Sequence, residues 1–406
     1  MKSHNDCMMN NASSDDGSNE DDEEQSVVEE NIEELENEFS ETDSFFNKTY
    51  QILSEEAVSL KNIYVLQLET HFQNKNIKLV AGLSNFSFIV YNVDDHLHAN
   101  FSHAAHDNVI TGLKFVSDNE NLFYSGSLDG TIKLWDMRTK TKPSIIFKDD
   151  TDDKEKLKPI NCFDVSCDNK FICAGTPLVE ADSYLLFWDI RKSSVLGGYW
   201  ESHTDDITQI KFNSNHSNSM LSGSTDGLIN IFDVSQSSED DALQNSLNVG
   251  TAIRKLEWLH DKNDSTVGCI TDMETLQLWK IDDAQPFQHF TRENIGSIAR
   301  VKSYDNTYIA DIHPVNENEI TIIAGSNANK GNHLKSLVYS DSEIHPSANF
   351  ENNKQLIRCT SYDKTNDMFV TAGESGIITV WIINDQSNGK IDMKERVQKT
   401  KYRFKI

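Results

Sequence analysis

The chain has 406 residues and a formal net charge of −28, and this charge is distributed unevenly. Residues 1–47 carry a net charge of −15, residues 48–389 carry −18 and residues 390–406 carry +5. An acidic chain lacks the dense lysine and arginine that contacts with phosphate backbones need, so we expect basic proteins as partners and no direct nucleic-acid binding. No run of eighteen apolar residues occurs, and the N-terminus has no apolar leader. We therefore expect a soluble intracellular protein without membrane contact.

The first 47 residues predict a disordered acidic extension. Their stretch SSDDGSNEDDEEQ is of low complexity and contains no aromatic residue. Four apolar residues then follow at helical spacing among glutamates: Val28, Ile32, Leu35 and Phe39. Two interpretations stay open here, a solvated and partly helical tail with no fixed partner, or an amphipathic arm that binds a basic protein.

The remainder of the chain contains an internal repeat. The stretch SGSLDGTIKLWDMR (125–138) has a near copy in SGSTDGLINIFDVS (222–235), and weaker copies occur before, between and after these two. The copies align on an aromatic residue that recurs every 42 to 60 residues: Tyr91, Trp135, Trp188, Phe232, Trp279, Tyr339 and Trp381. The alignment predicts seven repeated units over residues 48–389.

Apolar residues alternate within each unit, which is the period of a β-strand. The segments at 110–115, 162–165, 207–212 and 356–362 predict a further strand before each aligned stretch. Seven four-stranded units predict an all-β fold, a seven-bladed β-propeller. The last unit lacks an outer strand, so we expect KTYQIL (48–53) to supply it, with YRFKI (402–406) as the rival.

The repeat ends SGSLDGTIKLWD and SGSTDGLINIFD resemble WD-repeat proteins, with His106 and His203 at the position of that family's histidine. The resemblance implies a buried hydrogen-bonded relay in each complete blade, running from aspartate through histidine and serine to the tryptophan indole. The residues concerned are His106, Ser125, Asp129 and Trp135 in one blade, and His203, Ser222 and Asp226 in another. Because Phe232 has no donor, we expect the second relay to end at Ser222.

Ser, His and Asp could also form a hydrolase triad, but the spacing argues against it. Each histidine precedes its aspartate by 23 residues in both copies, whereas a hydrolase needs one triad, and no G-x-S-x-G elbow accompanies either serine. The last unit has lost most of the pattern, with Thr371 for serine, Ser375 for aspartate and Asn352 where histidine is expected. We therefore predict a structural role for these residues and no catalytic one.

Two aligned tryptophans belong to W-D-x-R sequences that end at Arg138 and Arg191. In WD-repeat substrate receptors of cullin-RING ubiquitin ligases, this motif helps to dock the adaptor. An arginine after a strand can equally pair with a local acid, so both interpretations stay open.

No cofactor or metal site is predicted, because Cys162, Cys167 and Cys173 lack zinc-ligand spacing. We expect a non-catalytic interaction scaffold, a monomeric propeller within a complex, that binds no small-molecule substrate. A basic nuclear protein, such as a histone or a ribosomal protein, is the favoured partner. The basic segment 390–406 is typical of a nuclear-import sequence, of a segment that binds an acidic partner or pairs with the acidic extension of the same chain, or of a solvated terminus. We expect the nucleus or the cytoplasm, and the nucleus is favoured.

Overall fold

The computed structural model describes residues 45–384 except 74–75, 95, 140–141, 150–156 and 260–264. The chain divides after Phe45 into two compact units, and the second begins at Phe46. The predicted extension up to residue 44 and the basic segment 390–406 lie outside the described residues. The disorder of the extension and the domain boundaries at 47/48 and 389/390 therefore stay predictions.

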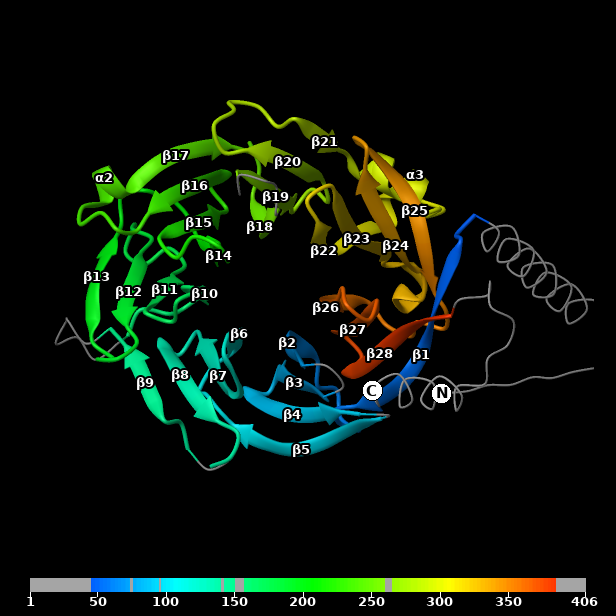
Figure 1. The fold of residues 1–406 in the computed structure, drawn as a ribbon, viewed down its shortest axis with the longest axis horizontal. Coiled ribbons are helices and arrows are strands. Elements are labelled where there is room, and N and C mark those ends of the chain that lie inside the picture. The colour runs from blue at the N-terminus through cyan, green and yellow to red at the C-terminus, as the bar shows by residue number, and fades with distance from the viewer. Residues whose placement is uncertain are drawn as a thin grey trace, which may run out of the picture. The chain divides into compact units, whose positions relative to one another are not determined.

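The second unit is built from β-sheets arranged around a central axis, and each four-stranded set is called a blade and named after its innermost strand (Figure 1). The β2 blade contains β2 (Val65–Gln73), β3 (Asn76–Leu83), β4 (Ser87–Val93) and β5 (Leu97–Ala104). The β6 blade contains β6 (Ile110–Val116), β7 (Asn119–Ser127), β8 (Thr131–Asp136) and β9 (Ile145–Lys148). The β10 blade contains β10 (Cys162–Val165), β11 (Phe171–Gly175), β12 (Leu185–Asp189) and β13 (Val195–Tyr199).

The remaining blades follow in chain order. The β14 blade contains β14 (Ile207–Phe212), β15 (Ser219–Ser224), β16 (Leu228–Asp233) and β17 (Leu243–Asn248). The β18 blade contains β18 (Ile253–Leu259), β19 (Thr266–Thr271), β20 (Leu276–Lys280) and β21 (Gln288–Phe290). The β22 blade contains β22 (Thr307–Asn316), β23 (Glu319–Ser326), β24 (Leu334–Ser340) and β25 (Glu343–Phe350), and the β26 blade contains β26 (Ile357–Asp363), β27 (Met368–Gly373), β28 (Ile377–Asn384) and β1 (Lys48–Ala57).

The predicted β-propeller is confirmed. The strands expected at 110–115, 162–165, 207–212 and 356–362 are the innermost strands β6, β10, β14 and β26. The aromatic residue on which the repeats align lies on the third strand of each blade, from Tyr91 on β4 to Trp381 on β28. The alternation of apolar residues fits this architecture because both faces of a blade pack against neighbouring blades.

The N-terminal strand closes the ring, as predicted. β1 pairs antiparallel with β28, with Ile52 opposite Trp381 and Thr49 opposite Asn384. Tyr50 stacks on Phe350 with ring centroids 4.8 Å apart, and its hydroxyl donates to the Asp367 carboxylate. The rival segment 402–406 lies outside the described residues.

β1 also forms a pairing that was not predicted. Its first three residues pair in parallel with β25, from Lys48 opposite Ala348 to Tyr50 opposite Phe350. This pairing merges the β22 and β26 blades into one eight-stranded sheet beside five separate four-stranded sheets. The division of that sheet into two blades, and with it the count of seven, stays an interpretation.

Hydrogen bonds at one register position join successive innermost strands. A side chain at the start of one innermost strand, or just before it, donates to a backbone carbonyl near the start of the next. The pairs are Thr111 to Ile160, Asn161 to Ile207, Thr208 to Ile253 and Arg254 to Ile309. The innermost strands therefore start at the same end of the propeller, and the turns between second and third strands lie at that end too.

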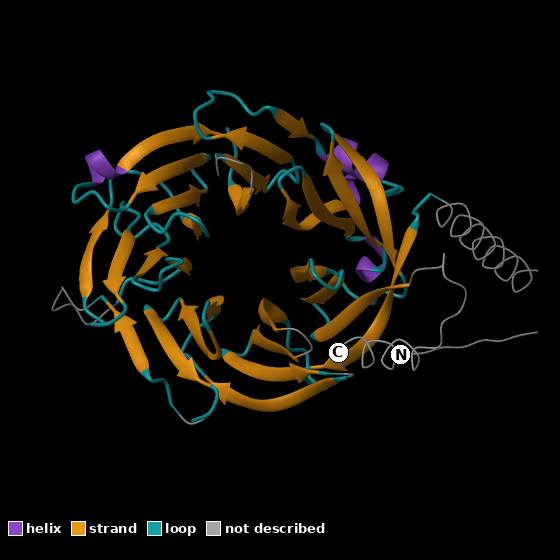
Figure 2. Cartoon of the chain, viewed as in Figure 1, coloured by secondary structure: helices purple, strands orange, loops and turns teal. Residues whose placement is uncertain are grey.

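Short helices lie outside the sheets (Figure 2). α2 (Glu239–Ala242) precedes β17, and α3 (Arg292–Ile298) with η1 (Tyr304–Asn306) precedes β22, while η2 (Ala328–Gly331) follows β23. The α3 insertion accounts for part of the longest repeat spacing, between Trp279 and Tyr339. Among the described residues, no helix is long and apolar enough to cross a bilayer.

Candidate functional site

The predicted relay residues of the β6 blade are in hydrogen-bond contact. His106 lies in the loop before β6, Asp129 in the turn before β8, Ser125 on β7 and Trp135 on β8. His106 Nδ1 is 2.8 Å from Asp129 Oδ2, His106 Nε2 is 2.7 Å from Ser125 Oγ, and the Trp135 indole donates to Ser125 Oγ at 2.8 Å. These partners assign the histidine proton to Nδ1, so the serine hydroxyl donates to Nε2 and accepts from the indole.

Burial and charge fit a structural relay. Ser125 is fully buried, and His106 and Trp135 are buried beside it. Burial alone would raise the pKa of Asp129, but hydrogen bonds from His106 and Thr131 hold that pKa below its usual range. The Ser125 hydroxyl has both of its hydrogen-bonding roles occupied and is shielded from solvent. The geometry therefore resembles that of a triad but gives the hydroxyl no access to a substrate.

The β14 blade contains the second copy. His203 Nδ1 is 3.0 Å from Asp226 Oδ2 and Nε2 is 2.6 Å from Ser222 Oγ, and Phe232 adds no donor. A branch that was not predicted runs through Asn230, which donates to the Ser202 carbonyl at 2.6 Å and lies 3.3 Å from His203 Nε2. In the β6 blade, Lys133 occupies the matching position and donates to the Ala105 carbonyl at 2.8 Å. In both blades, a polar side chain on the third strand thus donates a hydrogen bond to the backbone carbonyl of the residue that precedes the histidine.

The β26 blade keeps part of the relay with other residues. The Trp381 indole donates to Thr371 Oγ1 at 2.8 Å. This bond matches the one from the Trp135 indole to Ser125 Oγ in the β6 blade. Asn352, the expected histidine equivalent, is wrongly assigned, because it is exposed. Gln355 instead caps the turn before β28: it is buried, donates to the Ile377 carbonyl at 2.6 Å and accepts from the Ser375 backbone N–H at 3.1 Å. An amide can both donate and accept, so Gln355 binds the backbone of this turn, as the Asp129 carboxylate does when it accepts from the Thr131 N–H in the β6 blade.

The two W-D-x-R arginines lie at the opposite end of their blades from the relay turns. Arg138 donates from Nε and Nη2 to the two carboxylate oxygens of Asp136, at 2.9 and 2.6 Å. Arg191 makes the same fork to Asp189, at 3.1 and 2.9 Å. Hydrogen bonds from these arginines hold the pKa of both carboxyls below the usual range. Both arginine side chains remain mostly exposed, at 65% and 72%.

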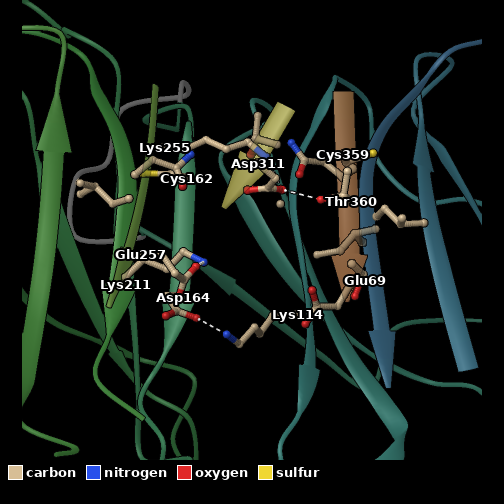
Figure 3. A pocket seen from close by; sticks show the side chains of 18 of the residues that line it. Glu69, Lys114, Cys162, Asp164, Lys211, Lys255, Glu257, Asp311, Cys359 and Thr360 are labelled. Atoms are coloured by element: carbon tan, nitrogen blue, oxygen red, sulfur yellow. Dashed lines mark hydrogen bonds and ion pairs between the residues drawn. The ribbon is translucent and has the colours of Figure 1, made fainter. Parts of the chain in front are cut away.

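The innermost strands carry a ring of charges that the sequence reasoning missed. Acidic and basic residues stand at matching positions of consecutive strands: Glu69, Lys114, Asp164, Lys211 and Glu257. They line a central pocket of about 370 Å³, into which these side chains point (Figure 3). Four of these charged residues each lie four positions after an isoleucine at the start of their innermost strand or just before it. These isoleucines are Ile110, Ile160, Ile207 and Ile253. Alignment on those isoleucines would have found the pattern.

Most of these charges are paired across the boundary between two blades. Lys114 Nζ lies 3.0 Å from Asp164, and Lys211 Nζ lies 2.7 Å from Glu257. The same Asp164 accepts from the Phe212 backbone N–H at 2.8 Å, so it bridges three blades. Asp164 beside Lys114 raises the pKa of that ammonium group, which stays charged at neutral pH.

A second set of contacts in the same pocket joins the β18, β22 and β26 blades. Lys255 Nζ lies 2.6 Å from Asp311, which also accepts from Thr360 (Figure 3). His313 bonds Thr360 Oγ1 at 2.6 Å, and burial lowers the pKa of this histidine. The charged side chains that line the central pocket thus join the blades to one another. No group of three or more metal-ligating side chains occurs in the part of the chain that the structure describes.

The fold and the relay geometry define a WD-repeat β-propeller. Residues 97–326, more than half of the chain, match the family described as "Nucleolar protein 10-like, N-terminal domain", a β-propeller family. The chain therefore belongs to the nucleolar protein 10-like N-terminal domain family.

Several curated relatives are WD-repeat proteins as well. WD repeat-containing protein GTS1 of Arabidopsis thaliana is 34% identical over 44% of this chain and 44% of its own length. An uncharacterised WD repeat-containing protein of Saccharomyces cerevisiae is 27% identical over 72% of this chain and 70% of its own. The WD repeat-containing protein 89 homolog of Dictyostelium discoideum is 24% identical over 86% of this chain and 94% of its own. These relatives support a protein-interaction scaffold as the general role.

Proposed function

We propose that this chain is a non-catalytic interaction scaffold whose partner is a basic nuclear protein, such as a histone or a ribosomal protein. One observation carries the proposal: the chain has a net charge of −28, and many of the lysines that the structure describes are already paired with acids inside it. The surplus negative charge is therefore available to an external cation. The match to a nucleolar protein 10-like family supports a nuclear location for this role.

Two acidic loops of the chain, 148–156 and 237–243, could present this charge, and only part of each is available. In the loop 237–243, Asp240 and Asp241 are exposed, but the Glu239 carboxylate turns inward and binds the backbone of the neighbouring blade. In the loop 148–156, Asp149 pairs with Lys158 at 2.7 Å, and residues 150–156 lie outside the described residues. The proposal therefore places most weight on the segment 1–47, which carries a net charge of −15.

Deletion of residues 1–40 tests the proposal. We expect the truncated chain to bind purified core histones more weakly than the full chain and with less dependence on salt, because it lacks acids whose attraction to a basic protein is screened by ions. A matched control replaces the acids of the segment with their amides at unchanged length and should behave like the deletion. Equal binding and equal salt dependence of the full and truncated chains would contradict the proposal.

A second candidate function is that of a substrate receptor of a cullin-RING ubiquitin ligase. It is supported by the two exposed guanidinium groups at equivalent positions of adjacent blades. Their forks to Asp136 and Asp189 provide a purely local reason for the motif. The double variant Arg138→Ala and Arg191→Ala should lose co-purification of the ligase adaptor if this function holds, with unchanged binding of the basic protein.

A further inference from the structure

One exposed tryptophan stands apart from all others in the chain. All six tryptophans lie in the described residues, and Trp200 is 51% exposed, whereas Trp135, Trp188, Trp258, Trp279 and Trp381 are no more than 4% exposed. Trp200 follows β13 directly, at the boundary between the β10 and β14 blades. An exposed tryptophan is one of the residue types that most often contribute binding energy in interfaces.

The backbone under Trp200 is held in place by the neighbouring blade. The Glu239 carboxylate, on α2 of the β14 blade, accepts from the backbone N–H groups of Trp200, Glu201 and Ser202 at 2.8 to 2.9 Å. The Ser202 hydroxyl donates to the same carboxylate. Because one half-buried acid fixes three consecutive residues, the exposed ring has little backbone freedom to lose on binding.

A hairpin of the β10 blade lies beside this loop. Residues 176–184 connect β11 to β12, and their tip is closed by a bridge between Val179 and Asp182. The Leu178 backbone N–H donates to the Asp206 carboxylate at 2.7 Å, and Ser183 Oγ donates to the Asp205 carbonyl at 2.7 Å. The hairpin and the loop 200–206 therefore form one continuous surface, and Leu178, 46% exposed, adds a second apolar side chain to it.

The charge of this surface has a single sign. The segments 176–184 and 200–206 contain five acids and no lysine or arginine, and Asp182 and Glu201 are exposed. The nearby Lys158 lies over the Tyr184 ring, but it already pairs with Asp149. An apolar partner would leave these carboxylates facing it without compensation, whereas a guanidinium group can stack on the indole and pair with an adjacent acid.

We propose that this surface, formed by residues 176–184 and 200–206, binds an arginine-rich segment of the partner protein, with Trp200 as the stacking platform. The proposal rests on the proposed function and adds a contact on the propeller to the acidic segment 1–47. One arginine side chain of the partner lies on the Trp200 ring, and adjacent arginines of the partner pair with Glu201 and Asp182. Leu178 contacts the aliphatic part of the segment.

The fluorescence of Trp200 gives a direct test with the full chain. Because the other five tryptophans are buried, acrylamide quenches Trp200 selectively. Addition of an arginine nonapeptide should reduce this quenching, whereas a glutamate nonapeptide should leave it unchanged. In the variant Asp182→Asn with Glu201→Gln, the same protection should require a higher peptide concentration.

Variants separate the surface from other acidic parts of the chain. We expect Trp200→Ala to weaken binding of a labelled arginine nonapeptide about three- to fivefold, the range of an exposed cation–π contact. The control Leu196→Ala removes a side chain that is 52% exposed on β13 of the same blade and should leave binding unchanged. Thermal melts of both variants report whether the fold is retained.

The outcomes distinguish this inference from the proposed function. Peptide binding to the full chain with unchanged Trp200 quenching and unchanged affinity of Trp200→Ala overturns this surface and leaves the proposed function standing. A full chain that binds no arginine nonapeptide at low salt contradicts both. Protection of Trp200 together with weaker binding of Trp200→Ala supports both.

Discussion

The hydrogen-bond partners of each relay residue decide how much that residue contributes to the free energy of unfolding. In the β6 blade, Ser125 serves two partners, His106 and Trp135, whereas in the β14 blade Ser222 serves His203 alone because Phe232 carries no donor. A buried donor that loses its acceptor costs the free energy of its desolvation. The two blades therefore form a natural pair in which the same substitution has unequal effects.

Replacing each serine by alanine measures that inequality. We expect Ser125→Ala to lower the free energy of unfolding by about 2 kcal/mol, because it leaves the Trp135 indole without an acceptor. Ser222→Ala should cost less, since Asn230 lies within reach of His203. Urea titrations of both variants provide the comparison, and an equal or larger loss for Ser222→Ala would show that the indole bond is unimportant.

The low pKa of Asp129 makes its contribution depend on pH. A carboxyl whose pKa is lower in the folded than in the unfolded chain stabilises the fold above the unfolded pKa, about 3.9, and loses that effect as the pH falls through the folded value. We expect Asp129→Asn to destabilise the protein by a constant amount from pH 7 to about pH 5. The difference from the unsubstituted chain should shrink only below about pH 4, as measured by urea unfolding. A difference that shrinks already near pH 6 would point to another titrating group.

Some of these residues could be predicted from the sequence and others could not. The relay was readable because two copies repeat the same residue types at the same spacing. Gln355 was missed because it binds the backbone of the turn from a position that no other repeat uses, which leaves no spacing to recognise. Trp200 was missed because exposure is a property of the folded surface, and its sequence context resembles any turn.

At the scale of elements, closure of the ring depends on β1. The strand is paired with β28 along its length and with β25 at its start, so it joins the beginning of the propeller to two blades at its end. Its pairing with β28 could be predicted because the last repeat lacked an outer strand. The parallel pairing with β25 could not, since it depends on how closely two blades approach at their outer edges.

Truncation at two points tests the role of β1. Removal of residues 1–57 should lower the melting temperature and cause self-association, because it exposes the edges of β28 and β25. Removal of residues 1–44 keeps β1 and should leave the melting temperature unchanged. Thermal melts with light scattering distinguish the two chains, and equal behaviour would mean that closure does not need β1.

For the whole propeller, the charged side chains of the central pocket provide contacts between blades, and no single repeat contains both partners of such a contact. Asp164 is 4% exposed and receives hydrogen bonds from Lys114 and the Phe212 backbone, which belong to the two adjacent blades. Repeat alignment predicts blades but not how their innermost side chains pair, because pairing requires side chains from different repeats to meet.

Substitution of Asp164 tests this coupling. We expect Asp164→Ala to lower the free energy of unfolding by about 2 kcal/mol, because it leaves the buried Phe212 N–H without an acceptor and removes the carboxylate partner of Lys114. Asp240→Ala, an exposed acid on α2, is the control and should have little effect. Urea unfolding measures the free energy of unfolding of both variants. A loss no larger for Asp164→Ala than for Asp240→Ala would show that the charged side chains of the central pocket do not join the blades.

The central claim is that this propeller is a scaffold for a basic protein. Affinity purification of the full chain from nuclear extract, followed by mass spectrometry at low and high salt, tests it most directly. We predict that the enriched proteins are basic, that they dissociate at high salt, and that they are depleted when Trp200→Ala is used as bait. Enrichment of a cullin-RING adaptor without basic proteins, or of basic proteins that resist high salt, would contradict the claim.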